Sequence, residues 1–138
     1  MKEFVTKNNL AELETLTEEI FNYYLQNGIA EDACYEIRLA LEEAISNTIK
    51  YGYEDKQAHT IHVKAGIETN QIFLQIEDDA NAFNPLEAAT PDLSLPLEKK
   101  PIGRLGIYLM RTVMDGIDYK RAGTKNILKM TKVINTSR

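Results

Sequence analysis

The segment Leu41-Glu42-Glu43-Ala44-Ile45-Ser46-Asn47 lies at the centre of a predicted helix and carries the first clue to fold and function. Apolar side chains recur around it at three- and four-residue steps, the spacing of one helix face: Ala33, Ile37, Leu41, Ala44, Ile45 and the methyl-bearing Thr48. Glu43 and Asn47 are four residues apart, so they occupy neighbouring turns, with Asn47 on the flank of that face and Glu43 somewhat further round. A proton acceptor beside a neutral oxygen ligand suits metal-assisted phosphoryl transfer, although a solvated helix edge would show the same pair.

The composition is that of one globular domain. The chain has 138 residues, 43% hydrophobic and 27% charged, which suffices for a single core, so we expect one domain over residues 1–138. A net charge of −5 disfavours direct binding to nucleic acid. No apolar run has the length of a membrane span, the first residues lack a signal-peptide core, and Cys34 is the only cysteine. We therefore expect a cytoplasmic protein with no disulfide and no membrane contact.

Hydrophobic patterning predicts three helices and a largely antiparallel sheet. Residues 61–67 and 71–78 alternate apolar and polar side chains, as half-buried strands do, and a tight turn joins them. The other expected elements are an edge strand near residues 2–6, a helix capped by Asn9 and ending near Leu25, the helix described above ending near Tyr51, a short helix after Gly106, and a hairpin of residues 117–121 and 127–133. This order indicates an α+β fold with the helices on one side of the sheet.

Asp78 is the second informative residue. Its position in the alternation matches Ile72, Leu74 and Ile76, so its carboxylate points to the face that those residues bury. A buried carboxylate needs a hydrogen-bond partner. That partner is either the amino group of a ligand base or a backbone amide in the following turn, and the sequence leaves both open.

A third segment, Gly103-Arg104-Leu105-Gly106, directly precedes the short helix. Glycines at the start of a helix let backbone amides face an anion, and the helix N-terminus favours negative charge. A helix start with flexible glycines would look the same. The preceding stretch, residues 86–101, is polar and interrupted by three prolines, as is typical of a lid over a bound nucleotide.

Taken in order, the three segments resemble the GHKL ATPase superfamily. Residues 43–47 resemble its N-box, residues 78–85 its adenine-binding box, and residues 103–107 its second glycine box. The Tyr-Gly-Tyr sequence at residues 51–53 and the helix after Gly106 resemble one branch, the anti-sigma-factor serine kinases. The resemblance extends from about residue 10 to residue 132.

This resemblance implies a fold and a set of roles. The fold would be a two-layer sandwich of a mixed, mostly antiparallel sheet and three helices, with the nucleotide lying between helices. The implied catalytic base is Glu43, which would orient a substrate serine hydroxyl, and the implied Mg²⁺ ligand is Asn47. Asp78 would bind the exocyclic amino group of adenine. The other implied ATP-binding positions are Ala80, Phe83, Gly103, Arg104, Leu105 and Gly106.

Two positions depart from the family pattern. Ala80 stands where the adenine box normally has glycine, and its methyl costs little only if its φ is negative. Arg104 stands where the branch often has a second glycine. Its guanidinium either blocks the phosphate cradle or binds the phosphates, and the sequence leaves both open.

The leading functional hypothesis is an ATP-dependent serine kinase that acts as an anti-sigma factor. By resemblance it would phosphorylate a small anti-sigma antagonist, bind a sigma factor or other transcription regulator in an alternative complex, and form a homodimer. The competing hypothesis is a non-catalytic module in which Mg-nucleotide sets partner affinity. Only the first needs Glu43. A third alternative is an α+β interaction domain without a nucleotide.

Overall fold

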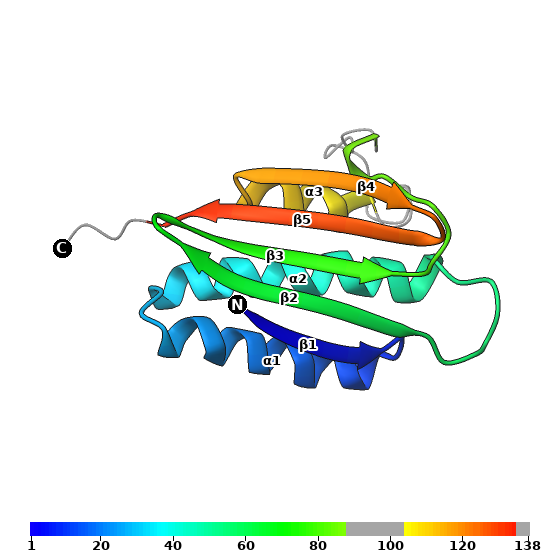
Figure 1. Cartoon of the computed structure of the whole chain (residues 1–138), viewed down its shortest axis with the longest axis horizontal. Helices are drawn as coiled ribbons and strands as arrows, with labels where there is room; N and C mark the ends of the chain where they lie inside the picture. Colours follow the sequence, from blue (N-terminus) through cyan, green and yellow to red (C-terminus); the bar gives the residue numbers. More distant parts are fainter. Residues whose placement is uncertain (88–103, 135–138) are drawn as a thin grey trace.

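The computed structural model describes residues 1–87 and 104–134. In this part of the chain, five strands form one sheet in the order β1-β2-β3-β5-β4, and three α-helices lie on one of its faces (Figure 1). The elements are β1 Lys2–Lys7, α1 Leu10–Gln26, α2 Glu31–Tyr51, β2 Thr60–Glu68, β3 Gln71–Asp78, the 3-10 turn η1 Pro85–Glu87, α3 Arg104–Val113, β4 Gly116–Ala122 and β5 Lys125–Val133. The expected two-layer α+β fold is therefore confirmed. Each strand pairing among these residues is antiparallel, so the mixed character expected of the sheet is not seen there.

The helices form where the apolar spacing predicted them. Along α2 the large side chains of the predicted stripe are buried, with Ile37, Leu41 and Ile45 each at most 1% exposed, and its small members are half-buried. The Asn9 side chain caps α1 by accepting a hydrogen bond of 2.9 Å from the Glu12 amide, as expected. These two helices pack on the sheet and on each other. The long α2 thereby becomes a rigid support with its flank at the edge of the core.

Strand β3 lies at the centre of the sheet, between β2 and β5. Its inward side chains Ile72, Leu74 and Ile76 are at most 3% exposed, as the alternation predicted. The same alternation brings Asp78 to the buried face, and the antiparallel register places it opposite Asn126 of β5. A carboxylate and an amide thus meet at the edge of an apolar core.

The start of α3 differs from the prediction. The helix begins at Arg104 rather than after Gly106, so Gly106 lies within the first turn. A Cβ on Gly106 would overlap Oε2 of Glu43 and lie 3.2 Å from its Cδ. The glycine therefore permits close packing of α3 on α2. Apart from η1, the expected lid at residues 86–101 falls outside the described residues.

Among the described helices, none combines the length and the hydropathy needed to cross a membrane.

Candidate functional site

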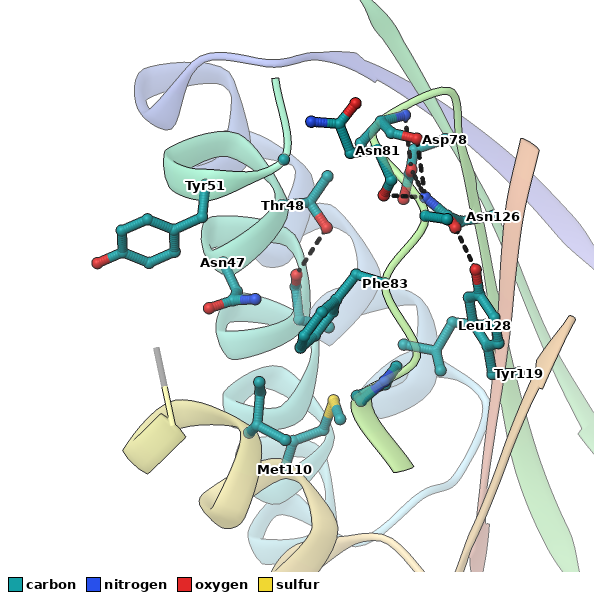
Figure 2. Close-up of a pocket in the computed structure, with 16 residues that line it drawn as sticks. Asn47, Thr48, Tyr51, Asp78, Asn81, Phe83, Met110, Tyr119, Asn126 and Leu128 are labelled. Carbon is teal, nitrogen blue, oxygen red and sulfur yellow. Dashed lines mark hydrogen bonds between the residues drawn. The ribbon is translucent and has the colours of Figure 1, made fainter. Parts of the chain in front are cut away.

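A cavity of about 280 Å³ opens beside the C-terminal half of α2 (Figure 2). Its other walls are α3, the β4–β5 hairpin and the segment that follows β3. The lining residues are Ala44, Asn47, Thr48, Tyr51, Gly52, Asp78, Ala80, Asn81, Ala82, Phe83, Pro85, Ile107, Met110, Tyr119, Asn126 and Leu128. An apolar wall with a few polar groups is the usual character of a small-molecule site.

Asp78 is the carboxylate of this cavity, and only 5% of it is exposed. Its Oδ1 accepts two hydrogen bonds, from the Ala80 amide at 3.0 Å and from Nδ2 of Asn126 at 2.9 Å. Within the described residues, Oδ2 makes no hydrogen bond. Burial raises the pKa of Asp78, and the two hydrogen bonds partly oppose that rise. Both partners left open by the sequence are thus compatible, because a backbone amide binds one oxygen and the other stays available to a ligand.

Asn126 was not identified from the sequence. It is 7% exposed, and its Nδ2 donates to Asp78 and also to the carbonyl oxygens of Ala80 and Asn81, each at 3.1 Å. One amide group therefore ties the end of β3 to the segment after it. The pairing of β5 with β3 is what would have identified it. The strand β5 begins at Lys125 rather than at residue 127, so Asn126 lies inside the strand and across from Asp78.

The β4–β5 hairpin holds the amide of Asn126 in place. Its Oδ1 accepts hydrogen bonds from the Tyr119 hydroxyl and from Nη1 of Arg121, the latter at 3.1 Å. The same Nη1 donates to the Ala80 carbonyl at 2.9 Å. These contacts fix which end of the Asn126 amide faces Asp78.

The departure at Ala80 is accommodated. Within the described residues, positive φ occurs only at glycines, so the methyl of Ala80 costs no backbone strain. That methyl is buried against Gly52 at the end of α2, where a Cβ would lie 2.9 Å from the Ala80 Cβ and 2.6 Å from the Thr48 carbonyl oxygen. The Gly52 carbonyl in turn accepts the Asn81 amide at 2.9 Å. Gly52 therefore provides the space that the alanine occupies.

Glu43 and Asn47 lie in different surroundings. Asn47 lines the cavity, whereas Glu43 is half-buried against Gly106, at the first turn of α3. Four residues of helix separate them, which corresponds to a rise of about 6 Å along α2. Among the described residues, no cluster of histidine, cysteine, aspartate or glutamate could hold a metal ion. A Mg²⁺ ion bound by Asn47 would therefore take its other ligands from phosphate oxygens and water.

The remaining predicted positions are Phe83, Gly103 and the three residues 104–106. Phe83 lines the cavity and is 43% exposed, and Figure 2 shows its ring among the side chains that border the hollow. Gly103 lies outside the described residues. Arg104, Leu105 and Gly106 form the first turn of α3, at the positive end of its dipole. The Arg104 side chain, which is expected either to block the phosphates or to bind them, falls outside the described part of the chain.

Comparison with known proteins gives consistent matches. A model of the histidine kinase-like ATPase domain matches residues 6–132. The anti-sigma F factor of Thermoanaerobacter sp. (strain X514) is 31% identical over 105 residues, which cover 75% of this chain and 72% of that protein. The serine-protein kinase RsbW of Listeria monocytogenes is 27% identical over 113 residues, covering 78% and 71%.

The structural comparison agrees at the level of the fold. The crystal structure of the RsbU and RsbW domains of a Mycobacterium tuberculosis protein matches 97% of this chain with a TM-score of 0.65. The sequence identity is 8%, and the match spans 33% of that longer chain.

The family match and the fold together identify the class as an α+β domain of the GHKL ATPase type, as the motifs implied. The chain belongs to the histidine kinase-like ATPase domain family, and its relatives include anti-sigma F factors and serine-protein kinases.

Proposed function

We propose that the cavity binds the base of an adenine nucleotide and that Asp78 recognises its amino group. The observation that carries this proposal is the buried Asp78, whose Oδ1 is occupied by two donors while Oδ2 makes no hydrogen bond in the described chain. A carboxylate oxygen without a partner in a largely apolar cavity favours a ligand that donates a hydrogen bond. ATP presents an amine there, whereas GTP presents a carbonyl, so GTP should bind poorly.

The phosphates would extend from the base along α2. Asn47 lies on the cavity wall. Glu43 lies one turn closer to the start of α2, where it contacts the first turn of α3. Backbone amides at the start of α3, from Arg104 to Gly106, are suited to an anion. When bound, Mg²⁺ would neutralise charge on the phosphate oxygens, with Asn47 as its protein ligand. A nucleotide in this orientation places its terminal phosphate nearer to Glu43 than to Asp78.

We infer that the reaction is transfer of the γ-phosphoryl group to a protein serine. The serine oxygen forms a bond to the γ-phosphorus, the bond from that phosphorus to the bridging oxygen breaks, and ADP leaves. Glu43 orients the hydroxyl and accepts its proton. The substrate would be a small anti-sigma antagonist in the cytoplasm, and a sigma factor or other transcription regulator would be the alternative partner of a homodimer. The names of the relatives support the anti-sigma and serine-kinase roles.

The test is transfer of radiolabelled phosphate from Mg-ATP to a co-encoded antagonist protein. Glu43→Gln keeps the size of the side chain but cannot accept the proton. It should lower the transfer rate by roughly 10²–10⁴ and change ATP affinity only a few-fold. The matched control is Glu42→Gln, because Glu42 is the neighbouring glutamate and pairs with Arg38 at 2.9 Å instead. Equal rates for Glu43→Gln and the wild type would refute the catalytic role.

A non-catalytic nucleotide-gated module is the second candidate. One observation favours it: Glu43 does not line the cavity, and its carboxylate packs against Gly106. In that case the wild type would bind Mg-ATP tightly, transfer no phosphate to any co-encoded protein, and change its partner affinity with nucleotide.

A further inference from the structure

The imidazole of His59 bridges two carboxylates next to the candidate site. His59 precedes β2, and its Nε2 lies 2.8 Å from Oδ1 of Asp55 while its Nδ1 lies 3.1 Å from Oδ2 of Asp79. The ring stacks on Tyr53, with centroids 4.3 Å apart and an interplanar angle of 20°. The His59 side chain is 17% exposed.

This geometry determines the protonation state that fits it. A neutral imidazole has one N–H group, so it can donate to only one of the two carboxylates. The imidazolium ion has two N–H groups and can donate to both. The hydrogen bonds to Asp55 and Asp79 accordingly raise the pKa of His59.

The main chain also fixes the position of His59. Its amide donates to Oδ1 of Asn8 at 2.8 Å, and its carbonyl accepts the Asn8 amide at 3.1 Å. The main chain of His59 is therefore attached to the junction of β1 and α1, which does not take part in the candidate site. From that fixed point the imidazole holds Asp79.

Asp79 links this bridge to the candidate site. It directly follows Asp78, and the two residues after it are held from the other side by Nδ2 of Asn126. The segment of residues 78–81 is therefore fastened from the interior by Asn126 and from the surface by His59. Arg121 and Gly52 also hold Ala80 and Asn81, so His59 is the side-chain attachment of Asp79, and its loss would loosen the segment directly beside the Asp78 carboxylate.

We propose that His59 is a positioning residue of the nucleotide site, and that its imidazolium form holds the Asp78 segment in the binding geometry. This inference rests on the proposed nucleotide binding and adds a regulation to it. Nucleotide affinity falls as pH rises and His59 loses its proton. By linkage, bound nucleotide makes that proton harder to remove.

The groups around His59 are Asp55, Asp79, Glu54, Tyr53 and, beyond Asp79, Lys125 and Asp78. Burial and the nearby carboxylates raise the pKa of Tyr53. Partial burial opposes the effect of His59 on Asp79, yet the pKa of Asp79 is lowered, as is that of Asp55 through the His59 hydrogen bond. These three groups therefore keep their charge state around neutral pH. The pKa of Asp78 is raised, so Asp78 could add its own pH dependence. The His59 variants below retain Asp78 and would show that dependence as well.

The experiment measures the affinity of ADP by calorimetry from about pH 6.5 to about pH 8.5, a range in which a histidine with a raised pKa loses its proton. The wild type should lose affinity by about two- to five-fold, the scale of a partly exposed ion pair. His59→Gln should show the weaker affinity at every pH. His59→Arg retains a planar cation that can stack on Tyr53, and it should show the tighter affinity at every pH. The matched control is His62→Gln, on the exposed side of β2, which should retain the wild-type slope.

Two results would overturn the role of His59. One is a wild-type pH slope equal to that of His59→Gln. Another is a His59 titration, followed by NMR, whose midpoint does not rise when ADP binds. If no protein binds ADP at any pH, the proposed nucleotide function fails as well, whereas tight but pH-independent binding removes only the role of His59.

Discussion

Asp78→Asn should separate nucleotide binding from stability. The substitution preserves the shape of the side chain, and its Oδ1 can still accept from the Ala80 amide and from Asn126. The other oxygen becomes an NH₂ group, which cannot accept the amino group of adenine. Leaving that polar contact unmade costs about 1–3 kcal/mol, so ATP affinity should fall about 5- to 150-fold.

The stability of the folded chain should respond in the opposite direction. Burial raises the pKa of Asp78, which means that the ionised carboxylate is less favourable in the fold than in the unfolded chain. Between the ordinary aspartate pKa of about 3.9 and the raised value, the folded chain binds more protons, so wild-type stability falls as pH rises. Asp78→Asn lacks this loss. Its unfolding free energy at neutral pH should equal or exceed that of the wild type, to within about 0.5 kcal/mol.

Calorimetric titration with ATP and urea unfolding at about pH 3.5 and about pH 7 test both parts. The stability advantage of Asp78→Asn should be larger at the higher pH. Asp118→Asn is the control, because Asp118 lies on the exposed side of β4 and does not line the cavity. Equal ATP affinity of Asp78→Asn and the wild type would refute the adenine assignment. A loss of stability above about 1 kcal/mol at neutral pH would refute the account of the buried charge.

Three further substitutions test the rest of the site. Asn126→Ala should lower the unfolding free energy measured in urea by about 1–3 kcal/mol, because several buried polar groups lose a partner. The control is Asn22→Ala on the exposed side of α1, which should change the unfolding free energy by less than about 0.5 kcal/mol. Asn47→Ala should weaken Mg-ATP more than Mg-free nucleotide in paired titrations, and equal losses would argue against a metal ligand. Gly106→Ala should leave the chain folded, because the Glu43 carboxylate can turn away, yet slow phosphate transfer; an unchanged rate would show that this contact is irrelevant to catalysis.

Local pattern sufficed for much of the fold. The three-and-four spacing of α2 and the alternation along β3 depend only on which side chains must be buried, so both elements were predicted with their correct faces. The same alternation indicated that Asp78 points inward. Its partner across the sheet was not predictable in this way, because Asn126 is distant in sequence and the pairing depends on the register of β5 with β3.

Tertiary packing explains the other differences. The sequence predicts that α3 follows Gly106, whereas Gly106 lies inside α3, and the close approach of Glu43 from α2 explains why this residue is a glycine. The need for a glycine at position 52 could not be predicted from the sequence either, because it depends on the methyl of Ala80, which packs on the end of α2. In both cases a side chain distant in sequence contributes to the need for glycine, and at Gly52 the nearby Thr48 carbonyl oxygen contributes as well.

The fastening of residues 78–81 has a consequence for how binding energy is distributed. Asn126 holds this segment from the interior, and Arg121 and His59 hold it from the surface, so the base would meet a carboxylate that is already oriented. Loosening the segment should therefore weaken ATP, ADP and adenosine by a similar factor, because all three present the same base. Asn126→Ala should show this uniform loss in parallel titrations. A loss confined to ATP would place the effect at the phosphates and contradict the role of these contacts in orienting Asp78.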